Sequence, residues 1–384
     1  MRSPFTPGEL PSVLAGRDQE LERLRRDLGQ VATFGRLAGR PSLFSAPRGI
    51  GKTSLLRTIQ REAEQVGFVT AWVSAREDQP LVPELARAVA AGVVRAGLGA
   101  GEGLQRWRDR LASFKVELGV PGVRVGAEFH ASGGSGPVDV TLEALVSDSS
   151  RLARDQGRAG LVVLIDELQA AASADLRTFA YAVQHLQGES RDAPAAWLGA
   201  GLPALPERLM EAATFAERFD YRTLARLTPT GTRDALEAPA TAVGVRWQSD
   251  ALDRAVRAAA GYPFMVQVLG DETWTASNGA DGGILTVGHV ERAEVSAIER
   301  MQPMFRGRWA KATAAERRFL AAMASVSEPV QRSAIADRLG QGTRGVSAAR
   351  SSLIDKGLIE PSGHGRLSFT TPGFAEFVLA QPES

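Results

Sequence analysis

The first part of the chain alternates short, continuous apolar runs with longer amphipathic segments. Residues 42–46 (SLFSA) and 161–165 (LVVLI) are apolar runs of strand length, which is typical of parallel strands buried on both faces. Residues 52–64 (KTSLLRTIQREAE) repeat apolar side chains at helical spacing and predict an amphipathic helix. This pattern predicts an α/β fold built on a parallel sheet.

A glycine-rich turn, PRGIG, joins the first of these strands to the helix. Strand, glycine loop and helix in this order form the context that a phosphate-binding loop requires. The backbone N–H groups of Gly49, Ile50 and Gly51 would point at the phosphates, and the helix N-terminus would add its positive dipole end. Lys52 would reach the terminal phosphates, and the Thr53 hydroxyl would hold Mg²⁺. An unrelated glycine turn before a helix is the alternative.

Alanine stands at position 46, where the usual phosphate-loop pattern has glycine. This residue lies where the strand ends, and alanine carries no conformational penalty there if its φ is negative. We therefore expect a working site that binds ATP with Mg²⁺. The predicted nucleotide-binding residues are Ala46, Pro47, Arg48, Gly49, Ile50, Gly51, Lys52, Thr53, Ser54 and Asp166.

Two acids, Asp166 and Glu167, follow the second apolar run. The carboxyl end of a buried parallel strand is where an open α/β sheet binds its ligands. Asp166 would bind Mg²⁺, mostly through water, and Glu167 would orient and deprotonate the attacking water. The alternative for Glu167 is a site that binds ATP as a switch and hydrolyses it poorly.

With these motifs in place, the chain resembles an AAA+ ATPase of the replication-initiator/archaeal-ATPase type, bordering on the signalling (STAND) ATPases. Residues 14–28 (LAGRDQELERLRRDL) are similar to the segment that packs over the adenine in that group. Residues 196–209 fit its fourth strand, residues 215–231 its arginine-bearing segment, and residues 258–274 its lid, with a Gly-x-Pro turn. The resemblance implies a P-loop AAA+ parallel sheet with a helical lid.

The chain departs from this family at two positions. The fourth strand usually ends in Asn, Ser or Thr, which senses the γ-phosphate, whereas Ala200 and Gly201 stand in that region here. The lid sequence GYPFMVQ also lacks the arginine that many AAA+ lids supply. Both departures favour slow turnover. Arg218 is the candidate arginine finger by its position in the family pattern, and the alternative is an ordinary solvated arginine.

The spacing between the two nucleotide motifs is long, because Lys52 and Asp166 stand 114 positions apart. The surplus lies at about 98–140, where an alternating pattern broken by Pro121–Gly122 predicts a hairpin. In the family, insertions here often contact DNA or partners. A surface loop without such a role is the alternative.

The last part of the chain has a different pattern, with two short helices predicted up to about 357 and then a hairpin around Gly363–Gly365. This order predicts a C-terminal winged helix-turn-helix domain. We expect an α/β nucleotide-binding domain at 1–228, a helical lid at 229–304 and the winged helix at 305–384. This last segment carries a local net charge of +4.

A basic helix-turn-helix favours double-stranded DNA, because its second helix enters the major groove and its arginines contact guanine edges or phosphates. The alternative is a winged helix that packs against the ATPase domain or a protein partner. The candidate DNA contacts are Arg344, Arg350, Lys356 and Arg366.

Composition sets the remaining limits. Cysteine is absent, which excludes disulfides and cysteine metal sites and fits a reducing cytoplasm. The sequence has no signal-peptide core and no apolar stretch of membrane-spanning length, so a cytoplasmic location is expected. The net charge of +1 gives the chain as a whole no preference for nucleic acid, so any basic surface must be local.

These features predict an ATP-binding AAA+ ATPase whose nucleotide state controls DNA binding by the winged helix. The resemblance to the family also allows a homo-oligomer in the ATP-bound state. One alternative is a STAND-like signalling switch, in which the winged helix holds the nucleotide in a closed state. Another is a factor that loads or remodels a protein partner without direct DNA contact.

Overall fold

The computed structural model describes residues 2–98, 107, 141–280 and 282–382. The hairpin predicted around Pro121–Gly122, like nearly all of the predicted 98–140 insert, lies outside the described residues. Among the described residues, no helix has both the length and the apolar character that a membrane span requires.

The centre of the molecule is a five-stranded parallel sheet with strand order β2-β3-β4-β1-β5. Its strands have the following bounds: β1 Ser42–Ser45, β2 Phe68–Ser74, β3 Gly160–Asp166, β4 Ala195–Gly201 and β5 Asp220–Thr223. Every residue of β1, β3 and β4 is buried, as the continuous apolar runs predict for strands covered on both faces. The predicted α/β fold with a parallel sheet is therefore confirmed.

Helices cover both faces of this sheet, and alternate residues of β3 belong to two separate cores. Val162 and Leu164 pack with the helices α1 Asp18–Phe34 and α2 Lys52–Gln65. Leu161, Val163 and Ile165 face the opposite layer. That layer contains α3 Leu81–Arg95, α5 Leu142–Asp155, α6 Ser173–Glu189 and α7 Leu205–Ala212.

Four helices follow β5 and form what we call the lid helices. They are α8 Pro229–Ala242, α9 Ser249–Ala259, α10 Pro263–Ala276 and α11 Val287–Ala310, and a short pair of strands, β6 Arg246–Trp247 and β7 Ile284–Leu285, joins their ends. The boundary expected between residues 304 and 305 lies inside α11. One continuous helix therefore connects the lid to the next part of the chain.

Residues 311–382 form what we call the C-terminal unit, a three-stranded antiparallel sheet of order β8-β10-β9 with four helices. In chain order its elements are α12 Ala314–Ala324, β8 Val330–Gln331, α13 Arg332–Arg338, α14 Ser347–Asp355, β9 Ile359–Pro361, β10 Arg366–Phe369 and α15 Phe374–Leu379. Two helices followed by a hairpin stand where the sequence pattern places them.

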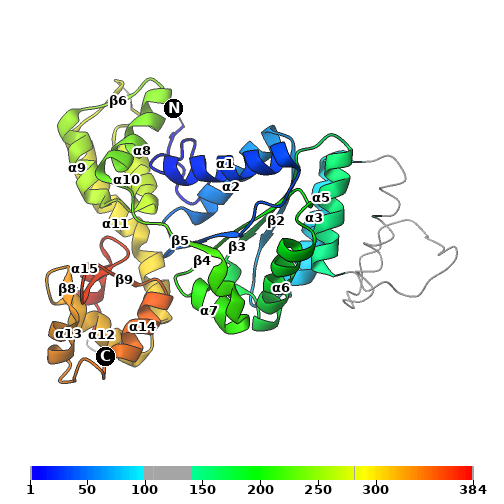
Figure 1. Ribbon diagram of the computed structural model, residues 1–384. Coiled ribbons are helices and arrows are strands. Elements are labelled where there is room, and N and C mark those ends of the chain that lie inside the picture. Colours follow the sequence, from blue (N-terminus) through cyan, green and yellow to red (C-terminus); the bar gives the residue numbers. More distant parts are fainter. Residues whose placement is uncertain (1, 99–106, 108–140, 281, 383–384) are drawn as a thin grey trace.

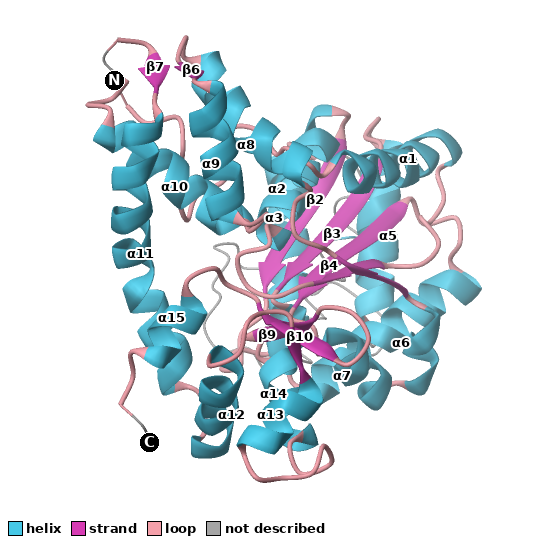
Figure 2. Cartoon of the chain, turned by 90° about the vertical axis from the view of Figure 1, so that its left-hand side faces the viewer, coloured by secondary structure: helices cyan, strands magenta, loops and turns pink. Residues whose placement is uncertain are grey.

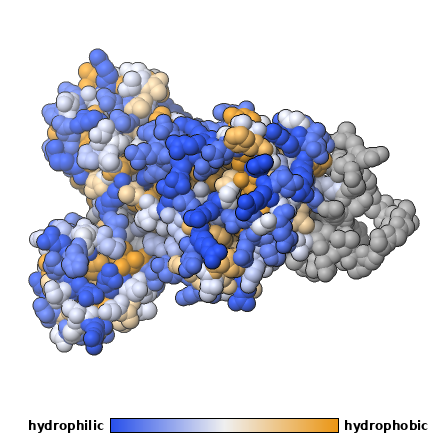
Figure 3. Space-filling model, viewed as in Figure 1, coloured by the Kyte–Doolittle hydropathy of each residue, from blue (hydrophilic) through white to orange (hydrophobic). Residues whose placement is uncertain are grey.

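The lid helices and the C-terminal unit lie one above the other on the same side of the ATPase sheet, and α11 runs from one to the other (Figures 1 and 2). Helices α3 and α5, which flank the insert, lie on the opposite side of the sheet in Figure 1. The surface is mostly hydrophilic in the view of Figure 3, where a notch separates the lid from the C-terminal unit. The nucleotide motifs lie between the sheet and these two parts.

Candidate nucleotide-binding site

The loop between β1 and α2 has the backbone of a phosphate-binding loop. Gly49 and Gly51 have φ of 84° and 91°, in the left-handed region that favours glycine, and Gly51 is the N-cap of α2. Ala46 has a negative φ, and its N–H donates to the carbonyl oxygen of Gly201 at 3.1 Å. The alanine therefore extends the strand without strain, as the sequence argument requires.

Lys52 lies at the start of α2 and is almost completely buried. Its ammonium donates to the carbonyl oxygens of Ala46 at 2.8 Å and Pro47 at 3.0 Å. Burial lowers the pKa of Lys52 from 10.5 to about 8, and the carboxylates of Glu167 and Asp166 partly oppose this shift. The loop holds the ammonium at its centre, where a phosphate would supply the missing negative charge.

Asp166 joins the end of β3 to the start of α2. Its Oδ2 accepts from Thr53 Oγ1 at 2.6 Å, and its Oδ1 accepts from the Glu167 N–H at 2.9 Å. Burial raises the pKa of Asp166, while the two hydrogen bonds oppose the change. A carboxylate beside a hydroxyl, next to a phosphate loop, fits the oxygen ligands that Mg²⁺ prefers. Thr53 and Asp166 are therefore the residues that would hold Mg²⁺.

A cavity of about 490 Å³ opens above this loop. One side consists of polar loop residues, including Arg48, Ser54 and Glu167, and the other is mainly apolar. The apolar side is made by Val13, Leu14, Ala15, Leu227, Ala235, Phe264 and Val266. Phosphates would lie at the polar end and a flat base at the apolar end, where the family resemblance places the segment that covers the adenine.

Tyr262 fixes the lid to the phosphate loop, which sequence reasoning missed. Its ring is fully buried, and its hydroxyl donates to the Arg48 carbonyl oxygen at 2.9 Å. A Cβ built on Gly49 would lie 2.0 Å from this hydroxyl, so only glycine fits there. The N–H of Phe264 also donates to the Gly49 carbonyl oxygen at 3.1 Å. The lid is therefore built directly onto the loop that would bind phosphate.

Arg17 is a second residue that sequence reasoning missed, although it lies inside the segment singled out at 14–28. It is 4% exposed and donates to the carbonyl oxygens of Ile50 at 3.0 Å and Ala225 at 2.7 Å. Burial lowers its pKa, and Glu20 opposes the shift. Arg17 thus ties the phosphate loop to the segment that leads from β5 into the lid.

Arg218 lies away from these residues. It ends the short 3₁₀ helix Thr214–Arg218 and is exposed, and its side chain makes no hydrogen bond or ion pair with the described residues. It does not line the nucleotide cavity of its own chain. A finger role for Arg218 would therefore need a second copy of the chain and stays a prediction.

The candidate DNA contacts fall into two groups. Arg344 and Arg366 are exposed, at the turn before α14 and on β10, while Arg350 is half-buried within α14. Lys356 instead donates to both carboxylate oxygens of Glu316, at 2.7 and 2.8 Å, and Glu316 is buried. Releasing Lys356 would leave a buried carboxylate without its partner, so we remove it from the DNA contacts.

Four features together define a P-loop nucleotide-binding protein. They are the parallel sheet, the glycine loop, the buried lysine and the Thr53–Asp166 pair. The sequence of residues 13–194 matches the family described as "AAA ATPase domain". The chain therefore carries an AAA ATPase domain, and its resemblance to AAA+ ATPases is confirmed. Residues 302–378 match a second family, described as "Domain of unknown function (DUF8462)".

Solved structures show the same fold. The Walker-type ATPase PABY2304 of Pyrococcus abyssi is similar with a TM-score of 0.62 at 15% identity, covering 98% of each chain. The ORC2 protein of Aeropyrum pernix, solved as ADPNP–ADP complexes, is similar with a TM-score of 0.60 at 16% identity, covering 98% of this chain and 95% of that one. No curated relative matches the chain.

Proposed function

We propose that the chain is an ATP-dependent switch, in which the nucleotide state of the AAA ATPase domain controls DNA binding by the C-terminal unit. The element order of that unit supports this proposal. Helix α12, strand β8, helices α13 and α14 and the β9–β10 hairpin follow the order of a winged helix. In such a domain α14 is the helix that enters the major groove and the hairpin is the wing.

The observation that carries the proposal is the position of α14. A cavity of about 570 Å³ is lined by Ser352, Asp355 and Lys356 from the end of this helix, and by Glu167 and Arg48 from the nucleotide site. The turn after the helix packs on the phosphate loop, since a Cβ on Gly357 would lie 3.2 Å from the Pro47 Cα. A nucleotide that moves this loop would therefore move the recognition helix.

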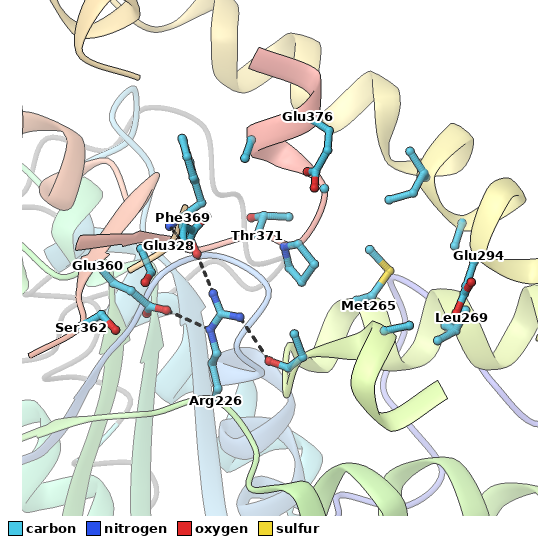
Figure 4. Close-up of a pocket in the computed structure, with 18 residues that line it drawn as sticks. Arg226, Met265, Leu269, Glu294, Glu328, Glu360, Ser362, Phe369, Thr371 and Glu376 are labelled. Carbon is cyan, nitrogen blue, oxygen red and sulfur yellow. Dashed lines mark hydrogen bonds and ion pairs between the residues drawn. The ribbon is translucent and has the colours of Figure 1, made fainter. Parts of the chain in front are cut away.

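Arg226 latches the C-terminal unit in this position, at the edge of a cavity of about 740 Å³ (Figure 4). Its guanidinium donates to Glu360 Oε1 at 2.9 Å and to the Phe369 carbonyl oxygen at 2.6 Å, both in the C-terminal unit. It also donates to the carbonyl oxygen of Ala260 in the lid at 3.2 Å. One side chain thus joins the lid to the β9–β10 hairpin.

Arg308 makes a second connection. It donates to the Thr371 hydroxyl in the C-terminal unit and, at 3.3 Å, to the hydroxyl of Tyr262. Tyr262 in turn holds the phosphate loop through Arg48. A change in the loop therefore has a path of hydrogen bonds to the C-terminal unit.

The same contacts favour a second candidate, a STAND-like signalling switch without DNA contact. A unit that packs on the phosphate loop would hold ADP in a closed state, and the absence of a polar side chain at Ala200 and Gly201 fits slow turnover. The two candidates differ in one respect: only the first requires an affinity for DNA.

The test uses the full-length chain and a fluorescent duplex. Glu167→Gln, which removes the base and keeps Thr53 and Asp166, should retain ATP, whereas Lys52→Ala should bind none. We expect the ATP-loaded Glu167→Gln variant to bind duplex at least about tenfold more tightly than Lys52→Ala, with an affinity that falls steeply with salt. Salt-sensitive binding in neither variant, with ADP retained through purification, would instead select the signalling switch.

Two arginines refine the DNA proposal. Arg366→Ala should weaken binding to all duplexes alike and reduce the salt slope by about one unit, because it would remove a phosphate contact. Arg344, near the start of α14, is the better candidate for a base contact, and its loss should reduce discrimination between sites by roughly 1–3 kcal/mol. Arg350, half-buried within α14, is also better suited to a phosphate contact, so Arg350→Ala should weaken binding to all duplexes alike.

A further inference from the structure

The end of β4 lacks a polar side chain, and a residue from the neighbouring strand end occupies that place. A Cβ built on Gly201 would lie 2.6 Å from Gln169 Oε1, closer than packed atoms approach. Gln169 is 7% exposed and lies in the 3₁₀ turn Leu168–Ala170 that follows Glu167. Glycine at 201 thus makes room for the Gln169 amide.

Two hydrogen bonds fix the orientation of this amide. Gln169 Oε1 accepts from the Leu202 N–H at 2.9 Å, and because a backbone N–H is always a donor, the oxygen must face Leu202. Gln169 Nε2 then faces Glu167 and donates to Oε2 of that carboxylate at 2.6 Å. Arg208 anchors the turn, since its guanidinium donates to the carbonyl oxygens of Gln169 and, at 3.1 Å, Ala171.

Glu167 itself is held in an unusual backbone conformation. Its φ is 51°, in the left-handed region that non-glycine residues rarely adopt, and such strain is concentrated at functional sites. Its Oε2 is bound to Gln169, while its Oε1 makes no hydrogen bond with the described residues. The carboxylate therefore keeps one oxygen available to the nucleotide cavity that it lines.

We infer that Gln169 is a positioning residue for ATP hydrolysis: it holds the Glu167 carboxylate in one orientation and ties it to the end of β4. This inference rests on the proposed role of Glu167 as the base. In that step the water oxygen bonds to the γ-phosphorus and the bond from phosphorus to the bridging oxygen breaks. The water proton passes to Glu167 Oε1, and ADP and inorganic phosphate leave.

The test compares Gln169→Leu and Gln169→Glu with the wild-type chain in steady-state ATP hydrolysis. Gln169→Glu keeps an acceptor for the Leu202 N–H and replaces the donor to Glu167 by a carboxylate oxygen, so it tests the role with little change of shape. Both variants should lower kcat by about tenfold to hundredfold. KM for ATP should change little, because Gln169 does not line the nucleotide cavity.

The separate effects on kcat and KM distinguish positioning from a structural role. A structural defect of the site should weaken ATP binding together with turnover. Loss of the Gln169 donor alone should lower kcat at an unchanged KM for ATP. The loss of kcat should be larger in Gln169→Glu, where two carboxylates would face each other.

Gln60→Leu is the matched control. Gln60 is 9% exposed and also donates to a glutamate, with Nε2 at 3.1 Å from Glu64 Oε1, but it does not line the nucleotide cavity. A KM for ATP that rises in step with the fall of kcat, or a loss of kcat no larger than in Gln60→Leu, would overturn the inference. Wild-type turnover by Glu167→Gln would overturn the role of Glu167 as base as well, so the two failures can be told apart.

Discussion

The phosphate loop and the contact between the ATPase domain and the C-terminal unit are held together in different ways. The loop is fixed by the backbone conformations of Gly49 and Gly51 and by a lysine that bonds to carbonyl oxygens five and six positions away. The contact includes Arg226, whose partners Glu360 and Phe369 lie 134 and 143 positions further along the chain.

This difference suits the phosphate loop to nucleotide binding and the contact with the C-terminal unit to the proposed switch. A structure fixed by neighbouring residues keeps its shape when distant parts move, which suits a site that must bind nucleotide in every state. The hydrogen bonds of Arg226 contribute about 1 kcal/mol each, so they can be lost at small cost. In the proposed switch, the loop would bind nucleotide in each state and this contact would open between states.

Lys52→Ala should have the largest effect on nucleotide affinity. Among the described residues, Lys52 is the only lysine that lines the nucleotide cavity. We expect nucleotide affinity to fall by at least about a hundredfold, or roughly 3 kcal/mol. Titration with a fluorescent ATP analogue would measure it. Lys311→Ala, at an exposed lysine outside this cavity, is the control. Unchanged affinity in Lys52→Ala would contradict the assignment of the site.

The strands, the helix and the loop of the ATPase domain could be predicted because the residues that determine each of them are adjacent in the sequence. The run LVVLI identifies a strand covered on both faces, and APRGIGKT specifies a loop from adjacent residues. The structure places Lys52, Thr53 and Asp166 together because β1 and β3, which lie on either side of β4, are parallel and end at the same edge of the sheet.

Gln169, Tyr262 and Arg17 were missed because their roles depend on residues far from them in the chain. Nothing near Gln169 indicates that Gly201 leaves space for its amide. The GYPF turn resembles a lid in its sequence, but only the fold brings Tyr262 onto Gly49. The departure at Ala200 and Gly201 was the available clue, since a missing side chain suggests that a neighbour fills its place.

Gly49→Ala should have the next largest effect and tests how tightly the lid holds the loop. The new Cβ would combine a strained φ with a clash against the Tyr262 hydroxyl, at a total cost of about 2–4 kcal/mol of unfolding free energy. Gly8→Ala is the matched control, because Gly8 has φ of 86° and nothing within 4 Å of the new Cβ. Urea denaturation would measure the free energy of unfolding of both variants. Equal losses in Gly49→Ala and Gly8→Ala would mean that the Tyr262 hydroxyl moves aside at little cost.

Arg226→Ala should break the contact while leaving the loop intact. Loss of three hydrogen bonds should destabilise the closed arrangement by about 1–2 kcal/mol and raise the radius of gyration of the nucleotide-free chain. Small-angle scattering would measure the change. Arg254→Ala, which removes ion pairs confined to the lid, should leave it unchanged. An unaltered radius in Arg226→Ala would show that Arg226 is not the latch.

The smallest expected effect is a pH dependence of nucleotide affinity that originates in the loop. The pKa of Lys52 is lowered to about 8 by burial, and a bound phosphate would raise it again. Below pH 8 the lysine is protonated in both states, so affinity should be flat. Above pH 8 the free protein loses the proton and binding must take it up, so affinity should fall by about fivefold between pH 8 and pH 9. Lys52→Arg removes this titration, because arginine stays protonated over the whole range, and its affinity should be flat. A fall of the same size in Lys52→Arg would place the titrating group elsewhere and leave the loop insensitive to pH.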